Sequence, residues 1–183
     1  MKLLVFTLSI VLLSGIVSAA VPQWVHPGTS ATYHMTSGGW ANGAPTENNA
    51  AEVYITHQVD EVTAQGTTGT VSIYNPLTGQ TQTQQVTCPD GETACLGRLW
   101  LDPKDPAGSF KDETGVTYTI GNRIAYSAAG RNWDATMMSY QNPGSGVVYS
   151  VIYDTQSGLV LAYNHEYPSE KIYSTLQETN AEV

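Results

Sequence analysis

Basic residues are scarce in this sequence, which has seven Lys and Arg against sixteen Asp and Glu and a formal net charge of −9. Proteins that bind nucleic acid or anionic lipid need clustered positive charge to neutralise phosphate groups. No cluster of Lys or Arg occurs in the sequence. We therefore expect no nucleic-acid partner and no electrostatic attachment to an anionic membrane surface.

Long apolar runs are also missing after the first twenty residues. Those twenty residues carry one positive charge at Lys2, a mostly apolar run over residues 3–13, and small residues ending in Ala19 and Ala20. This layout is typical of a cleavable secretory signal peptide, and the run is shorter than a membrane-spanning helix. We expect residues 1–20 to be removed, no transmembrane helix in the mature chain, and a secreted or cell-surface and envelope location.

Only two cysteines occur, Cys88 and Cys95, separated by a Pro-Asp-Gly turn sequence. In an exported chain, the expected state of such a pair is a disulfide bond. A zinc site would need two further ligands, and no nearby histidine has a suitable spacing. We predict a disulfide that stabilises the fold by roughly 2–3 kcal/mol, and neither a metal nor a cofactor.

Helical periodicity is absent, whereas alternation of apolar and polar residues recurs along the chain. Residues 52–60 show it clearly, and similar patterns follow at 71–73, 99–101, 116–120, 137–140, 147–153 and 159–163. Turn sequences rich in Gly, Pro and Asn separate these segments, which indicates hairpins. Residues 168–179 fit a strand or a short helix, and the alternation favours the strand.

These patterns predict one all-β domain over residues 21–183. We expect an antiparallel meander that forms a curved sheet, half-barrel or open barrel, with at most short helices. The polar run over residues 80–85 predicts a solvent-facing edge strand. Residues 38–51 are rich in Gly, Asn and Ala and predict an exposed loop.

One segment resembles a known family. In residues 148–163, a strand ends in Tyr153, an Asp-x-x-Ser-Gly turn follows at residues 154–158, and the return strand opens with Leu159 and Leu161. This hairpin is similar to one in envelope lipoprotein carriers of the LolA and LppX type. The resemblance implies a strongly curved antiparallel half-barrel whose concave face shelters an acyl chain or another apolar ligand. It assigns no functional residue.

Catalytic patterns are weak, and we assign no catalytic residue. Ser145 lies between two glycines, but it joins two strands rather than the strand and helix of a nucleophile elbow. His57 falls on the apolar side of its strand and is expected to be buried. An enzymatic role is therefore less favoured than a binding role.

Aromatic and methionine side chains offer a better candidate site. Tyrosine is abundant, with eleven residues against two phenylalanines, and amphipathic rings suit a surface that is partly wet. If a pocket exists, we expect its walls to contain Trp100, Trp133, Met137, Met138, Tyr149 and Tyr153.

The favoured function is therefore a non-enzymatic exported binding module for a lipid or other apolar ligand, or for a cell-envelope partner. One alternative is a structural subunit of an extracellular matrix or filament that self-associates by adding strands at a sheet edge. A second alternative is a small secreted hydrolase.

Overall fold

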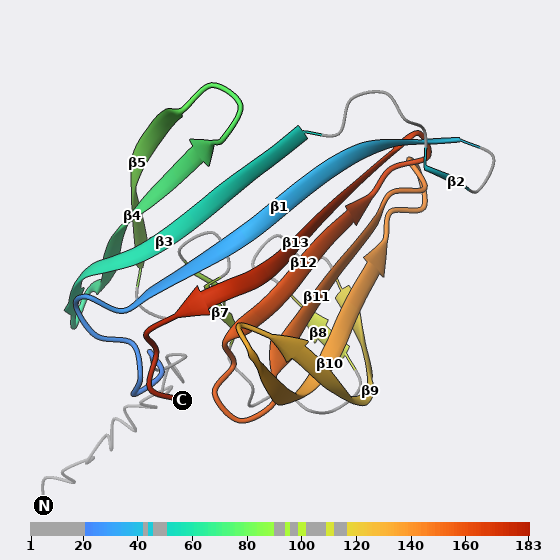
Figure 1. Cartoon of the computed structure of the whole chain (residues 1–183). Helices are drawn as coiled ribbons and strands as arrows, with labels where there is room; N and C mark the ends of the chain where they lie inside the picture. The colour runs from blue at the N-terminus through green and yellow to red at the C-terminus, as the bar shows by residue number, and fades with distance from the viewer. Residues whose placement is uncertain are drawn as a thin grey trace, which may run out of the picture.

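The computed structural model describes residues 21–41, 44–45, 51–89, 94–95, 99–101, 109–111 and 117–183 (Figure 1). Within these residues every regular element is a strand, as the alternating sequence patterns predict. The strands are β1 (Ser30–Ala41), β2 (Ala44–Pro45), β3 (Ala51–Thr63), β4 (Gly66–Asn75), β5 (Gln80–Pro89), β6 (Ala94–Cys95), β7 (Trp100–Leu101), β8 (Ser109–Lys111), β9 (Thr117–Ala128), β10 (Arg131–Gln141), β11 (Val148–Asp154), β12 (Val160–Glu166) and β13 (Glu170–Thr179).

Eleven of these strands form one antiparallel sheet, ordered β5-β4-β3-β1-β13-β12-β11-β10-β9-β8, with β2 paired to β1. The short strands β6 and β7 pair with each other. The large sheet ends at β5 on one side and β8 on the other, so it is open rather than closed. The predicted all-β antiparallel fold is confirmed.

The sheet consists of two meanders joined by the first and last long strands. Strand β1 pairs with β13 along most of its length, with Tyr33 opposite Leu176. Asn180 extends the join, since its side-chain Oδ1 accepts from the backbone N–H of Ser30 at 2.7 Å. Figure 1 shows β1 and β13 side by side, while the β4–β5 hairpin stands out from one end of the sheet.

Strand alternation gives the sheet two different faces. We call inner the face that carries Tyr33, Val151 and Leu176, each at most 1% exposed. The outer face of β1 and β3 carries Thr32, whose hydroxyl hydrogen-bonds that of Thr56 at 3.0 Å. Most of the apolar core therefore lies on the inner face, although Ile152 and Ala162 are buried on the outer face.

Two irregular segments cover one end of the inner face, which we call the closed end. The indole N–H of Trp24 donates to the carbonyl of Ser157 at 2.9 Å, and its ring meets Trp100 edge-on at 6.3 Å. Trp100 in turn forms an antiparallel bridge with Leu159. Residues 21–29 and 99–101 thus bury the inner face where β11 turns into β12.

Several local expectations can be compared with these strands. Residues 170–179 form β13, so the strand interpretation of the C-terminal segment is confirmed. Residues 80–85 lie in the edge strand β5, also as predicted. The loop expected at residues 38–51 is interrupted, because β1 continues to Ala41 and residues 44–45 form β2. Strand β1 itself was not anticipated, although Ala31, Tyr33 and Met35 alternate with polar residues.

Other expectations concern residues outside the described ranges. The predicted signal peptide, residues 1–20, lies there in full, and so does the side chain of Cys95. Cys88 is 4% exposed, and no free cysteine occurs among the described residues. The bond between Cys88 and Cys95 remains a prediction.

Candidate functional site: an aromatic row on the inner face

A continuous row of rings crosses the inner face. Neighbouring ring centroids are 4.9–6.4 Å apart, the range in which aromatic pairs attract one another. We call this set the aromatic row; in order across the sheet it contains His57, Tyr33, Tyr163, His165, Tyr149, Tyr140 and Tyr118.

Strand register produces this row from residues that are distant in the sequence. Tyr140 on β10 lies opposite Tyr149 on β11, and Tyr149 lies opposite His165 on β12. Opposed residues of antiparallel strands share a face and bring their Cβ atoms within about 5.5 Å. The contacts between the rings therefore follow directly from strand pairing.

A serine bridges the row where it crosses β13. Ser174 lies opposite both Tyr163 and Met35, and its side chain is 0% exposed. Its small size leaves room for the rings of Tyr33 and Tyr163 to meet across β13 at 5.8 Å. The Ser174 hydroxyl has no hydrogen-bond partner among the described residues. The small volume of the Ser174 side chain, and not a hydrogen bond, therefore explains why serine occupies this position.

Burial changes along the inner face. Near the closed end, Tyr33 and Leu161 are fully buried. Toward the opposite end, the inner-face side chains are only partly buried; they are Met35, Ser37, Val53, Tyr140, Tyr149, Tyr163, His165 and Ile172. We call these eight residues the inner-face patch. Apart from Ser37 it is apolar or aromatic, and parts of it remain in contact with solvent.

Tyr33 anchors the row at its buried side. Its phenol donates to the carbonyl of Val160 at 2.8 Å, which satisfies the only polar group of a fully buried ring. Burial raises the pKa of Tyr33 well above its ordinary value of 10.0, and the neighbouring Tyr163 raises it further. The phenol therefore stays neutral in the folded protein.

The six residues expected to line a pocket are not all brought together. Tyr149 belongs to the inner-face patch. Four others are at least nine-tenths buried; they are Trp100, Trp133, Met138 and Tyr153. Met137 is 40% exposed and, as the neighbour of Met138 in a strand, points to the opposite face. Their role in ligand binding remains a prediction.

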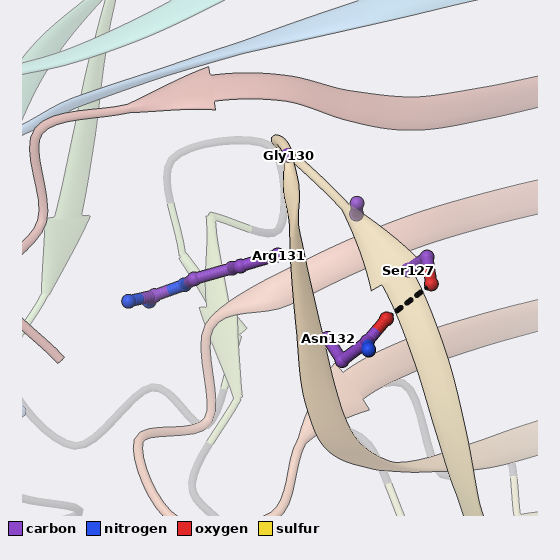
Figure 2. A pocket seen from close by; sticks show the side chains of 5 residues that line it. Ser127, Gly130, Arg131 and Asn132 are labelled. Carbon is purple, nitrogen blue, oxygen red and sulfur yellow. Dashed lines mark hydrogen bonds between the residues drawn. The ribbon is translucent and has the colours of Figure 1, made fainter.

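The contacts of Trp133 stabilise the hairpin formed by β9 and β10. Its indole N–H donates to the carbonyl of Ala128 at 2.9 Å, and the guanidinium carbon of Arg131 lies 3.5 Å from its ring centroid. A shallow hollow of about 280 Å³ lies at this hairpin tip. Figure 2 shows Ser127 and Asn132 bonded to each other there, with Arg131 extending away from them. Ser127 and Asn132 bond to each other and Arg131 lies over the Trp133 ring, so we assign no ligand to the hollow.

The hairpin that resembles the lipoprotein carriers has a clear local explanation. Asp154 Oδ2 accepts from the backbone N–H of Ser157 at 2.8 Å and from its hydroxyl at 2.7 Å. Gly158 has φ of +75°, a value that favours glycine. Leu159 and Leu161 are fully buried. The shared residues therefore build a tight turn beside the core.

On the outer face, a smaller aromatic cluster surrounds a carboxylate. The imidazole of His34 stacks on Tyr54 at 5.0 Å, and its Nε2 lies 2.7 Å from Glu52 Oε1. Tyr54 also donates to Glu52, at 3.3 Å. Desolvation of the phenol raises the pKa of Tyr54, and the neighbouring Glu52 raises it further. The cluster links β1 to β3 on a solvated surface.

The part of the chain that the structure describes contains neither a metal-binding cluster nor a membrane-spanning helix. No group of three or more His, Cys, Asp or Glu side chains there could hold a metal ion. No helix there is long and apolar enough to cross a membrane.

Comparisons with known proteins do not assign a family. No family model matches the chain. Over 61 residues, 33% of this chain, it is 41% identical to kinesin-like protein KIF28 from Mus musculus, and the match spans 6% of that protein. A solved outer membrane lipoprotein-sorting protein domain from Vibrio parahaemolyticus is 10% identical and matches 87% of this chain and 86% of its own, with a TM-score of 0.27. Neither likeness carries a functional argument.

Sequence reasoning missed most of the aromatic row. Tyr118, Tyr140, Tyr163 and His165 each occupy the inner phase of an alternating strand, a signal that the sequence contains. What it does not contain is the register between strands, which brings these rings into contact.

Proposed function

We propose that this chain is an exported, non-enzymatic binding protein that holds an apolar ligand against the inner-face patch. The observation that carries the proposal is the change in burial along one face. Tyr33 and Leu161 are fully buried near the closed end of this face, whereas Tyr149, His165 and Ile172 toward its opposite end are partly exposed. Apolar side chains left partly exposed on a core-facing surface are typical of binding surfaces.

The composition of the patch indicates the class of ligand. Ile172, Val53 and Met35 offer apolar contact, while the tyrosines and His165 combine an apolar ring with a polar edge. This mixture suits an acyl chain or a similar apolar body that carries a polar end group. Of the six residues predicted from sequence, we propose direct ligand contact for Tyr149 and a supporting role for the others.

Export and envelope location form part of the same proposal. They rest on the signal-peptide layout of residues 1–20 and on the hairpin that resembles the lipoprotein carriers. A processed N-terminus at Ala20 or Val21, measured by mass spectrometry of secreted protein, would support export. An intact Met1 in the protein recovered from the producing cells would contradict it.

Titration with dansyl-undecanoic acid tests binding, since the dansyl group brightens in an apolar environment. We expect saturable binding that Tyr149→Ser weakens at least fivefold. Ile172→Thr should also weaken binding. Because threonine retains a β-branched side chain, this change carries little risk to folding. Tyr173→Ser removes a tyrosine that is 37% exposed on the adjacent outer face of β13 and should change binding less than twofold.

Circular dichroism would first establish that each variant is folded. Failure of the wild-type protein to bind the probe saturably would contradict the proposal. Equal weakening by Tyr149→Ser and Tyr173→Ser would contradict it as well, because binding would then not depend on the inner face.

A further inference from the structure

The edge hairpin formed by β4 and β5 has no charge. Residues 66–89 contain no Asp, Glu, Lys, Arg or His, in a chain whose net charge is −9. Strand β3 beside it carries Glu52, Asp60 and Glu61, so the loss of charge begins where the hairpin begins. Two copies of a strongly acidic protein repel each other least where such a neutral surface faces its equivalent.

Strand β5 lacks the features that usually protect a sheet edge. Protective features include charged side chains, bulges and prolines within the strand. Strand β5 pairs with β4 through ten consecutive residues without a register shift, and its proline, Pro89, is its last residue. Among the described residues β4 is its only neighbour, so one row of its backbone groups faces outward (Figure 1).

Polar side chains cover both faces of this edge. Residues 80–85 are all exposed. On the outer face Gln85 Nε2 already donates to Thr70 Oγ1 on β4 at 2.8 Å, and Thr70 donates to Asp60 at 2.7 Å. A Gln and a Thr on neighbouring strands therefore form a cross-strand hydrogen bond in this sheet. The same pair can recur across the open edge.

We propose that β5 pairs antiparallel with β5 of a second copy of this chain, around a two-fold axis at Thr83. In this register Thr83 faces its own equivalent, and Gln82 faces Gln84 of the second copy. Thr81 faces Gln85 of the second copy, which reproduces the Thr–Gln pairing seen between β4 and β5. The two sheets become one continuous sheet, and the contact is self-complementary as a two-fold interface requires.

Sedimentation velocity over about 1–200 μM protein tests the proposal. Because the paired edges carry no charge, we expect added salt not to dissociate the dimer. The wild-type protein should shift from monomer to dimer as concentration rises. Thr83→Lys places two positive charges opposite each other and should weaken dimerisation at least tenfold. Thr119→Lys makes the same change at an exposed position of β9, a strand paired on both sides, and should leave dimerisation within twofold.

Cross-linking tests the register independently. Thr83→Cys should form a covalent dimer under copper phenanthroline in air, because directly opposed Cα atoms lie about 4.5–5.5 Å apart, within disulfide reach. Thr81→Cys lies on the same face but would be separated from its equivalent by about 13 Å and should not cross-link.

Three results would overturn the inference. They are a wild-type protein that stays monomeric at 200 μM, equal weakening by Thr83→Lys and Thr119→Lys, and equal cross-linking of the two cysteine variants. The inference does not depend on the ligand-binding proposal, because β5 lies outside the inner-face patch. A dimer that fails to bind dansyl-undecanoic acid would contradict only the proposed function.

Discussion

The phenol of Tyr33 donates to the backbone carbonyl of Val160 at 2.8 Å, although 127 positions separate the two residues in the chain. The bond joins the N-terminal meander to the C-terminal one beneath the sheet, at the fully buried side of the aromatic row. Because Tyr33 is 0% exposed, the hydrogen bond has no competition from solvent. It is therefore a sensitive reporter of whether the two meanders are joined.

Tyr33→Phe should lower the free energy of unfolding by about 1 kcal/mol at neutral pH, since the Val160 carbonyl loses its donor. The variant should also change the alkaline behaviour. In the wild type, the raised pKa of Tyr33 keeps the phenol protonated when folded, whereas the unfolded phenol ionises near pH 10. Ionisation of this group therefore gives stability no pH dependence below about pH 10, and stability falls as pH rises above that value.

Urea unfolding between pH 7 and 11 measures both effects. Above about pH 10, the Tyr33 proton should lower the free energy of unfolding of the wild type by up to about 1.4 kcal/mol per pH unit. Tyr33→Phe should lack this contribution. Identical pH profiles for the wild type and Tyr33→Phe would show that Tyr33 is not buried as described.

Ser174→Ala should stabilise the protein slightly or leave it unchanged. The Ser174 hydroxyl is buried and has no hydrogen-bond partner in the part of the chain that the structure describes. Removing it relieves a desolvation cost of about 1–3 kcal/mol, which the small space left behind partly offsets. Ser150→Ala is the matched control, since Ser150 Oγ accepts from Asn164 Nδ2 at 3.5 Å. Thermal unfolding should rank Ser174→Ala above Ser150→Ala, and the reverse order would contradict this explanation.

Asp154→Ala should destabilise the fold by about 2–4 kcal/mol. One carboxylate oxygen of Asp154 accepts three hydrogen bonds from Gln156 and Ser157, and the residue is 7% exposed. Hydrogen bonds to charged groups contribute about 1.5–3 kcal/mol each, with losses partly shared. Asp154→Asn keeps an acceptor and should cost less in chemical denaturation. Equal losses for the two variants would indicate that the hydrogen bonds are not the cause.

In the turn between β9 and β10, we expect substitutions at two neighbouring positions to change stability in opposite directions. Ala129 has φ of +50° and Gly130 has φ of +73°, both in the left-handed region that favours glycine. Ala129→Gly should therefore stabilise the protein by about 0.5–1 kcal/mol, whereas Gly130→Ala should destabilise it by about 1 kcal/mol. A Cβ added at Gly130 would meet no atom within 4 Å, so the loss would reflect backbone conformation alone. Calorimetry gives both signs.

The predicted disulfide can be tested on the processed protein. Non-reducing mass spectrometry should find a mass about 2 Da below that of the reduced form. Reduction should then lower stability by roughly 2–3 kcal/mol, the amount expected for a short closed loop. Cys88→Ser and Cys95→Ser should lose similar amounts, since either change opens the same loop. Free thiols in the native oxidised protein would contradict the prediction.

Much of the fold could be predicted from local patterns. Alternation over residues 52–60 and the Gly- and Asn-containing turns fix the strands and hairpins, because both depend on neighbours in the chain. The burial of His57 also follows from its strand phase and is observed, at 3% exposed. For the six expected pocket residues, the sequence offers only their residue types as a signal. Type does not distinguish a buried Trp133 from a partly exposed Tyr149.

By itself the sequence determined the all-β class, the positions of most strands, the polar edge at residues 80–85 and the acidic charge. These are properties of residues and of their close neighbours. Tertiary structure decided that β1 and β13 pair, which joins the two meanders into one open sheet. It also decided which rings form the aromatic row. Pairing between distant strands depends on burying the inner face of the whole sheet at once, and no local pattern encodes that register.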